Sequence, residues 1–183
     1  MNTKYEFTGE TKIVYGRTLR RIKAIVAIGA TVAPGDIGGW IESENNLSVS
    51  GNAWVHGDAM VSDNACVYGN ACVSGNAWVY GDARVYGDAC VYGGACVYGD
   101  AEVHGDARVF GDEDYMTFKN SWSSGRWFTY TASNKKWSVG CFYGTGDELV
   151  RKAYADSELS GRCYEAIVRA VETIEAAKGR GVK

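Results

Sequence analysis

Residues 51–112 repeat one six-residue pattern ten times without a slip, and this feature most limits the fold. From Gly51 the chain reads GNAWVH, GDAMVS, DNACVY and onward to GDARVF, after which GDEDYM breaks the pattern. Alanine occupies the third position from Ala53 to Ala107, and valine the fifth position through Val109. A unit this short cannot bury its apolar side chains alone, so successive units must stack on one another.

The chemistry of each repeat predicts a parallel β-helix. Alanine and valine alternate with an outward residue, so both point to one side of a short strand. Glycine followed by Asp or Asn supplies a corner, where a positive φ or a side-chain bond to the backbone is needed. Three sides of six residues give a coil of 18, so residues 51–112 make about three and a half coils with strands roughly 4.8 Å apart.

Residues 18 apart should stack, so the outward side chains form columns. The three columns are Trp54, Cys72, Cys90 and Arg108; Met60, Trp78 and Cys96; and Cys66, Arg84 and Glu102. The second column is apolar throughout, with Tyr80 and Tyr98 at its corner. A soluble monomer rarely exposes such a stripe, so we predict that another chain or the C-terminal segment covers it. The alternative is that the aromatic residues only form ladders over the strands.

Composition narrows the class of protein further. The net charge is −3, but residues 51–112 alone carry 2 Lys/Arg and 8 Asp/Glu. Direct DNA binding is therefore not expected, and an acidic β-helix that mimics DNA is an alternative. Four of the six cysteines fall at one repeat position, which favours reduced thiols in a cytosol. No leader or membrane-spanning apolar run is seen, so we expect a cytoplasmic protein that does not bind membranes.

Residues 1–50 predict an N-terminal β cap that closes the first rung of the coil. Residues 30–36 resemble one degenerate rung with an insertion. The short strands expected in the cap are Tyr5–Phe7, Lys12–Tyr15 and Leu19–Ile25.

Residues 113–183 predict a third domain, a C-terminal α+β module of two strands and two helices. The strands are Trp127–Thr131 and Lys136–Phe142, and Thr145 with Glu148 forms a capping box that opens a helix to about Tyr154. A second helix starts at Ser160. Its apolar stripe consists of Cys163, Ile167, Ala170, Ile174 and Ala177. We predict a homodimer or homotrimer whose interface draws on Ile167, Ala170 and Ile174 or on the second column of the coil.

Two segments outside the repeats resemble a known group of proteins. The segment Gly35-Asp-Ile-Gly-Gly-Trp40-Ile-Glu-Ser, then Asn46-Leu47-Ser48, is similar to the start of phage and prophage hexapeptide-repeat proteins and of YdcK-type proteins. The tail from Trp137 to Leu149 is similar to the C-terminal module of such phage proteins. The resemblance implies a left-handed coil and a phage origin. It brings no established activity and no catalytic residue.

The number and positions of the histidines do not favour an enzyme. Hexapeptide-repeat acyltransferases use a His base near a subunit interface and loops that hold the acyl donor. His56 and His104 are the only histidines, they belong to different corner columns, and no loop is inserted. Two histidines cannot supply a three-His zinc site, so we expect no catalytic residue, metal or cofactor. A trimeric acyltransferase is the enzymatic alternative.

The C-terminal module carries the predicted ligand site, where cations alternate with aromatic residues. That mixture suits a nucleotide, through phosphate charge and base stacking. The alternative is a strand pair with core tryptophans and a solvated lysine turn. We therefore predict a non-enzymatic phage accessory protein that sequesters or inhibits a host factor, either a nucleotide-type signal or a host protein. The candidate residues are Trp122, Arg126, Trp127, Tyr130, Lys135, Lys136 and Trp137.

Overall fold

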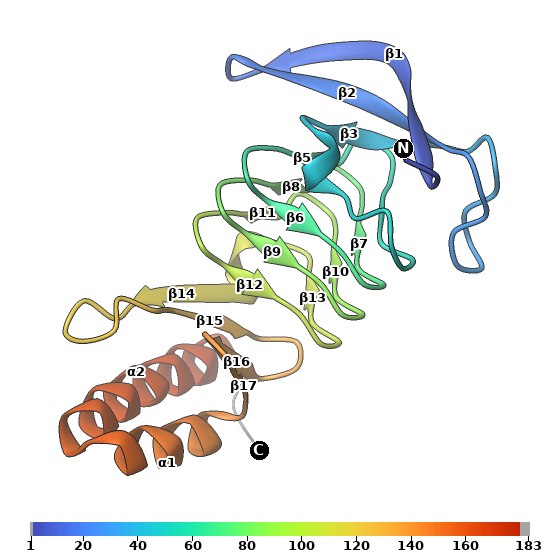
Figure 1. Ribbon diagram of the computed structural model, residues 1–183. Helices are drawn as coiled ribbons and strands as arrows, with labels where there is room; N and C mark the ends of the chain where they lie inside the picture. The colour runs from blue at the N-terminus through green and yellow to red at the C-terminus, as the bar shows by residue number, and fades with distance from the viewer. Residues whose placement is uncertain (1, 180–183) are drawn as a thin grey trace. The chain divides into compact units, whose positions relative to one another are not determined.

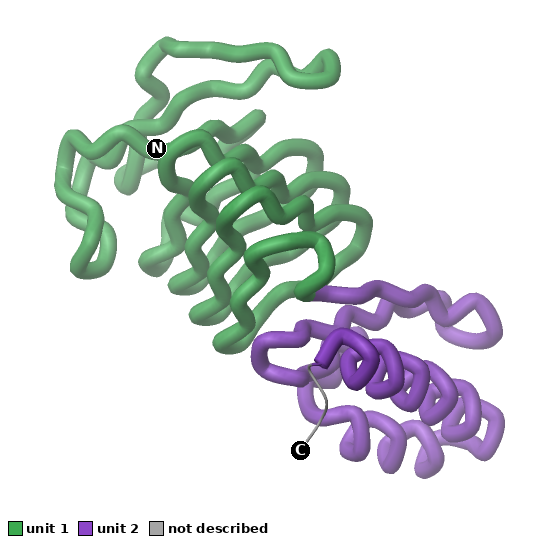
Figure 2. The backbone as a smooth tube through the Cα atoms, turned by 180° about the vertical axis from the view of Figure 1, so that it is seen from behind, with its two compact units in different colours: residues 1–114 green, residues 115–183 purple. Residues whose placement is uncertain are grey.

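The computed structural model describes residues 2–179 and divides into two compact units, residues 1–114 and 115–183 (Figures 1 and 2). The first unit holds both the N-terminal cap and the repeats, so residues 1–50 are not a separate compact unit. Neither helix in the described part of the chain combines the length and apolar character needed to cross a membrane.

The repeats form a parallel coil of ten two-residue strands (Figure 1). Cys90 lies in register between Cys72 and Arg108, and Trp78 between Met60 and Cys96, which confirms the predicted stacking of residues 18 apart. The strands are β4 (Trp54–Val55), β5 (Met60–Val61), β6 (Cys66–Val67), β7 (Cys72–Val73), β8 (Trp78–Val79), β9 (Arg84–Val85), β10 (Cys90–Val91), β11 (Cys96–Val97), β12 (Glu102–Val103) and β13 (Arg108–Val109).

The side chains inside the coil are fully buried, and successive rungs lie close together at its corners. Every repeat alanine from Ala53 to Ala107 and every repeat valine from Val55 to Val109 is at most 1% exposed. At the corner residue Gly75, φ is +68°, and a Cβ would lie 2.9 Å from the carbonyl oxygen of Gly93 on the next rung. The corners thus need glycine both for the backbone conformation and for the close stacking of rungs.

The first rung of the coil starts before the repeats, at β3 (Ile37–Ile41). β3 runs parallel to β5, with Trp40 opposite Met60, an offset of 20 residues instead of 18. The 3₁₀ turn η1 (Glu44–Asn46) follows β3. The expected rung at residues 30–36 is wrong: this segment is a loop closed by backbone hydrogen bonds between Ile28 and Val32.

Close packing explains why positions 38 and 39 of the Gly-Gly-Trp segment are glycine. A Cβ on Gly38 would lie 2.6 Å from Cζ2 of Trp54, and one on Gly39 would lie 2.5 Å from Cγ1 of Val55. The chain therefore crosses the end of the coil at a distance that only glycine permits.

An antiparallel hairpin completes the cap. Its strands are β1 (Tyr5–Val14) and β2 (Arg17–Ala24). Because β2 pairs with β3, the hairpin extends the sheet that carries the second column of the coil. The prediction of two separate strands at Tyr5–Phe7 and Lys12–Tyr15 is wrong. They belong to one strand with an irregularity around Gly9, where φ is +93°.

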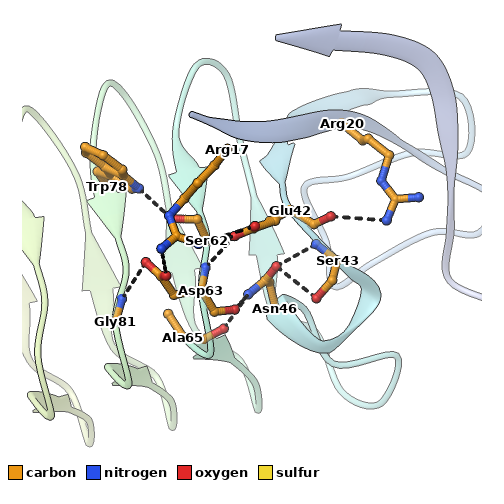
Figure 3. A network of polar contacts seen from close by, with 10 residues as sticks. All are labelled: Arg17, Arg20, Glu42, Ser43, Asn46, Ser62, Asp63, Ala65, Trp78 and Gly81. Carbon is orange, nitrogen blue, oxygen red and sulfur yellow. Dashed lines mark hydrogen bonds and ion pairs between the residues drawn. The ribbon is translucent and has the colours of Figure 1, made fainter. Parts of the chain in front are cut away.

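One corner of the coil anchors this hairpin (Figure 3). Arg17 donates to the Glu42 carboxylate at 3.2 and 3.3 Å and pairs with the Asp63 carboxylate. The backbone N–H of Asp63 donates to Glu42 Oε2 at 2.7 Å. Asp63 has a φ of +60° in the one repeat that opens with Asp in place of glycine. Its side chain therefore explains the exception in the pattern.

The C-terminal unit contains a four-stranded antiparallel sheet in the order β14-β15-β16-β17 and two helices. The prediction of two strands is wrong, because the unit has four. The expected strand Lys136–Phe142 breaks at Gly140, where φ is +57°. The elements are β14 (Tyr115–Lys119), β15 (Trp127–Thr131), β16 (Lys136–Val139), β17 (Phe142–Gly144), α1 (Gly146–Asp156) and α2 (Glu158–Ala177).

The predicted capping box is present at α1. The Thr145 hydroxyl accepts from the Glu148 backbone N–H at 3.3 Å, and Glu148 Oε2 accepts from the Thr145 N–H at 2.8 Å. α2 starts two residues earlier than Ser160, because Ser157 caps it by accepting from the Ser160 N–H at 3.1 Å.

The predicted apolar stripe of α2 is not its buried face. The buried residues are Gly161, Val168, Val171 and Glu175, and the two valines pack in the core with Phe128 and Trp137. The predicted stripe is rotated away by about one residue. Of its members, Cys163 is half-buried, Ile167 packs partly against the core, and Ala170, Ile174 and Ala177 are exposed.

Candidate functional site

The C-terminal unit contains a pocket of about 350 Å³. Four of the seven predicted ligand residues line it: Tyr130, Lys135, Lys136 and Trp137. The remaining lining residues are Asn134, Thr145, Gly146, Asp147, Val171 and Glu172. The volume is within the range of small-molecule sites, roughly 300–1,000 Å³.

The aromatic part of this pocket is a rigid wall. Tyr130 is 4% exposed and Trp137 is 2% exposed, with ring centroids 5.2 Å apart. Both rings belong to the core of the unit. Most of each ring is therefore covered by protein, and a ligand can meet only the part that faces the pocket.

The turn between β15 and β16 carries the two lysines, and Asn134 holds that turn. Asn134 Oδ1 accepts from the Thr131 hydroxyl at 2.6 Å and from the Lys136 N–H at 3.2 Å. Asn134 Nδ2 donates to the Tyr143 hydroxyl at 3.1 Å. Lys135 has a φ of +54°, as a tight turn requires. The sequence analysis missed Asn134 as a site residue, although a Ser-Asn-Lys-Lys turn favours such bonds.

The two helices supply acidic residues to the same pocket. Arg169 donates to Glu172 Oε2 at 2.7 Å and lies 3.6 Å from Asp147 Oδ1. The hydrogen bonds from the backbone and side chain of Thr145 lower the pKa of Glu148, and the charge of Lys136 lowers it further. The sequence analysis missed Asp147 and Glu172, since no motif connects them with the lysines.

The other three predicted residues lie elsewhere in the unit. Arg126 lines a second hollow of about 340 Å³, together with Cys141 and Lys152. Trp122 packs against Phe128 and Tyr164, with centroids 6.3 Å from each ring. Trp127 has the Lys119 ammonium 5.5 Å from its ring centroid. The seven residues therefore do not form one site.

The apolar column of the coil is partly covered by its own chain. The Tyr15 ring of the hairpin stacks on Trp78 at 5.3 Å with an interplanar angle of 6°, and Trp78 Nε1 donates to Ser62 Oγ at 3.1 Å. We expected another chain or the C-terminal segment to cover this column; the N-terminal hairpin covers part of it. Tyr98 stacks on Tyr80 at 5.4 Å and remains 50% exposed.

The histidines of the coil lie against aromatic rings. His104 stacks on Tyr86 at 4.4 Å, and His56 lies 6.5 Å from Trp54. Burial lowers the pKa of both imidazoles. Within residues 2–179, no group of three or more His, Cys, Asp or Glu residues could hold a metal ion.

A comparison with known protein families matches part of the repeats. The profile described as the YdcK β-solenoid repeat matches residues 65–81 and 83–99, and each matched segment spans about one 18-residue turn. The coil is a YdcK-like β-solenoid. The match lies within the solenoid and does not reach the pocket of the C-terminal unit. A search of curated proteins finds no match to the chain.

Proposed function

We propose that this YdcK-like repeat protein is a non-enzymatic binding protein whose C-terminal unit takes a small anionic ligand of the nucleotide type. The observation that carries the proposal is the pocket where Lys135 and Lys136 lie beside the Tyr130–Trp137 wall. Lysine ammonium groups attract phosphate, and an aromatic wall suits a base. A ligand pocket is typically apolar with a few placed polar groups, and this one fits that description.

The biological role that we propose is sequestration of a host factor by a phage protein in the bacterial cytosol. The resemblance of residues 35–48 and 137–149 to phage hexapeptide-repeat proteins supports this origin. A host protein is the alternative target. The acyltransferase alternative requires His56 or His104 as a base, and both are packed against rings at the corners of the solenoid.

Replacing both lysines, Lys135→Ala with Lys136→Ala, should weaken nucleotide binding by roughly a hundredfold or more, because each of the two charged hydrogen bonds contributes about 1.5–3 kcal/mol. Isothermal titration calorimetry of the full chain with nucleoside monophosphates measures this. Arg126→Ala is the matched control, since it removes a cation from the second hollow. Equal losses in the two variants would contradict this assignment of the site.

A second prediction concerns self-association through the apolar surfaces that stay exposed, Tyr98 at 50% and Ile174 at 40%. We propose a homodimer or homotrimer built on one of them. Tyr98→Glu or Ile174→Glu should dissociate it, because either change places a charge in an apolar interface. Native mass spectrometry of the purified chain reports the oligomer and any retained ligand together.

The control for self-association is Arg84→Glu, on the solvated third face of the coil, which should leave the oligomer intact. Light scattering that gives a monomer at micromolar concentration for the unmodified chain would contradict self-association.

A further inference from the structure

We propose that the pocket selects a guanine nucleotide, with the phosphate at the lysine turn and the base edge at Asp147 and Glu172. This inference rests on the proposed function and names the ligand of the same site. Three features of the pocket carry it: its two chemically different sets of charged residues, the ion pairs of its carboxylates with Arg169, and the acidic first turn of α1.

The cationic and the acidic residues that line the pocket come from different elements. Lys135 and Lys136 belong to the β15–β16 turn, whereas Asp147 belongs to α1 and Glu172 to α2. Ammonium groups only donate hydrogen bonds and ionised carboxylates only accept them. A ligand that fills the pocket therefore presents acceptors to the lysines and donors to the carboxylates.

The two carboxylates of the pocket share an ion-pair partner. Arg169 contacts Glu172 through Oε2 and Asp147 through Oδ1. The guanidinium offsets part of the negative charge, so the carboxylates repel a nearby phosphate less. Each carboxylate keeps lone pairs to accept from a ligand, both on its second oxygen (Oε1 of Glu172, Oδ2 of Asp147) and on the oxygen that contacts Arg169.

The start of α1, a position where many helices bind anions, is unfavourable for an anion here because its first turn is acidic. Glu148 Oε2 accepts the Thr145 N–H at 2.8 Å, and the Asp147 carboxylate lies in the same first turn. The negative end of the ligand is therefore directed to Lys135 and Lys136.

Among the common bases, guanine best matches the carboxylates of Asp147 and Glu172. Its Watson–Crick edge places the N1–H next to the N2 amino group, so two adjacent donors face one carboxylate, as a guanidinium does. Adenine offers one amino donor beside an acceptor nitrogen, which a carboxylate would leave unpaired. Hypoxanthine keeps the N1–H and lacks the amino group. The Tyr130–Trp137 wall tolerates any of the three rings, so selection depends on the carboxylates.

Calorimetry of the full chain with GMP, IMP, AMP and inorganic phosphate tests the inference. We expect GMP to bind about tenfold or more tightly than IMP and AMP, since each lost charged hydrogen bond costs about that factor. Glu172→Gln should reduce GMP affinity to that of IMP and change AMP affinity little. Asp147→Asn is a second variant, with thermal melts of both to show that they fold.

The outcomes separate the inference from the proposed function. Equal affinity for GMP, IMP and AMP overturns guanine selection and leaves nucleotide binding in place. Inorganic phosphate that binds as tightly as GMP overturns any role of the base. Absence of binding for every nucleotide at millimolar concentration overturns both proposals.

Discussion

Val79→Asp should lower the free energy of unfolding of the solenoid by at least several kcal/mol, because it places a carboxylate where nothing can pair with it. Val79 is fully buried and stacks between Val61 and Val97 in the sheet that carries the second column of the coil. Its neighbours inside the coil are the alanines and valines of adjacent rungs. We expect a large drop in the melting temperature of the first unit, measured by thermal denaturation.

The control is Arg84→Ala, on an outward column of the same coil. The Arg84 side chain is mostly exposed and its ion pair with Glu102 spans 3.1 Å. An exposed pair of this kind contributes under about 1 kcal/mol. Equal losses of stability in the two variants would contradict the assignment of inward and outward positions.

The sequence was sufficient for the coil because every repeat satisfies the same three requirements at once. Ala and Val fill the interior, a residue with positive φ turns the corner (glycine in all repeats but the one that opens with Asp63), and the outward residue is free to vary. An error of one residue would turn every valine outward, so the pattern permits one register only. The 18-residue stacking follows directly and the strand pairs confirm it.

The cap could not be predicted this way, because it completes the coil with different residues. The buried Asn46 donates to the carbonyl oxygens of Asp63 and Ala65, both at 2.9 Å, and so bonds the second rung with a side chain. Gly38 and Gly39 carry no side chain to display a period. Asn46, Gly38 and Gly39 all lie outside the Gly-Asp-Ala-Val pattern, so the first rung was misplaced at residues 30–36.

The buried face of α2 could not be predicted from the sequence, because two stripes with apolar residues run along the helix about one residue apart. The stripe through Ile167 and Ile174 is purely apolar, whereas the buried one includes Glu175, which is 1% exposed and pairs with Lys178 at 3.5 Å. Hydrophobic spacing alone does not tell which of the two stripes packs against the core of the unit. The contacts with Phe128 and Trp137 decide the matter, and they depend on tertiary structure.

The candidate site was predictable in part. The lysine turn and its aromatic neighbours are close in sequence, so composition brought Tyr130, Lys135, Lys136 and Trp137 together. Glu172 comes from α2, more than thirty residues later along the chain, and only the packing of that helix places it in the pocket. Arg126 belongs to the same cluster in sequence but lines a different hollow, since it precedes β15 whereas Lys135 and Lys136 follow that strand.

Replacing Lys4 with Met should stabilise the first unit at neutral pH, and the gain should disappear in alkali. Lys4 is 3% exposed, and its ammonium donates to the Ser48 carbonyl oxygen at 2.9 Å. Within the described residues, no carboxylate forms an ion pair with it. Burial therefore lowers the pKa of Lys4 from 10.5 to about 8.

The sign of the pH dependence follows from the two pKa values of Lys4. Below pH 8 the amine is charged in both the folded and the unfolded chain, so the folded state bears the full cost of burying the charge. Between about pH 8 and 10.5 the folded amine loses its proton while the unfolded amine keeps it, so stability rises with pH. The difference corresponds to about 3 kcal/mol, at 1.36 kcal/mol for each pH unit between the two values.

Urea titrations of the full chain and of Lys4→Met at pH 7 and pH 11 measure this difference. The variant should be more stable at pH 7 by up to about 3 kcal/mol, less the roughly 1 kcal/mol lost with the hydrogen bond to Ser48. Burial also raises the pKa of Tyr5 to about 12, which lowers stability above pH 10, but both proteins carry Tyr5, so this effect cancels in the comparison. Lys23→Met, on the surface of the same hairpin, corrects for the general effect of pH on the charge of the unit. A Lys4→Met variant that is less stable than the unmodified chain by the same amount at both pH values would show that Lys4 folds as a paired cation.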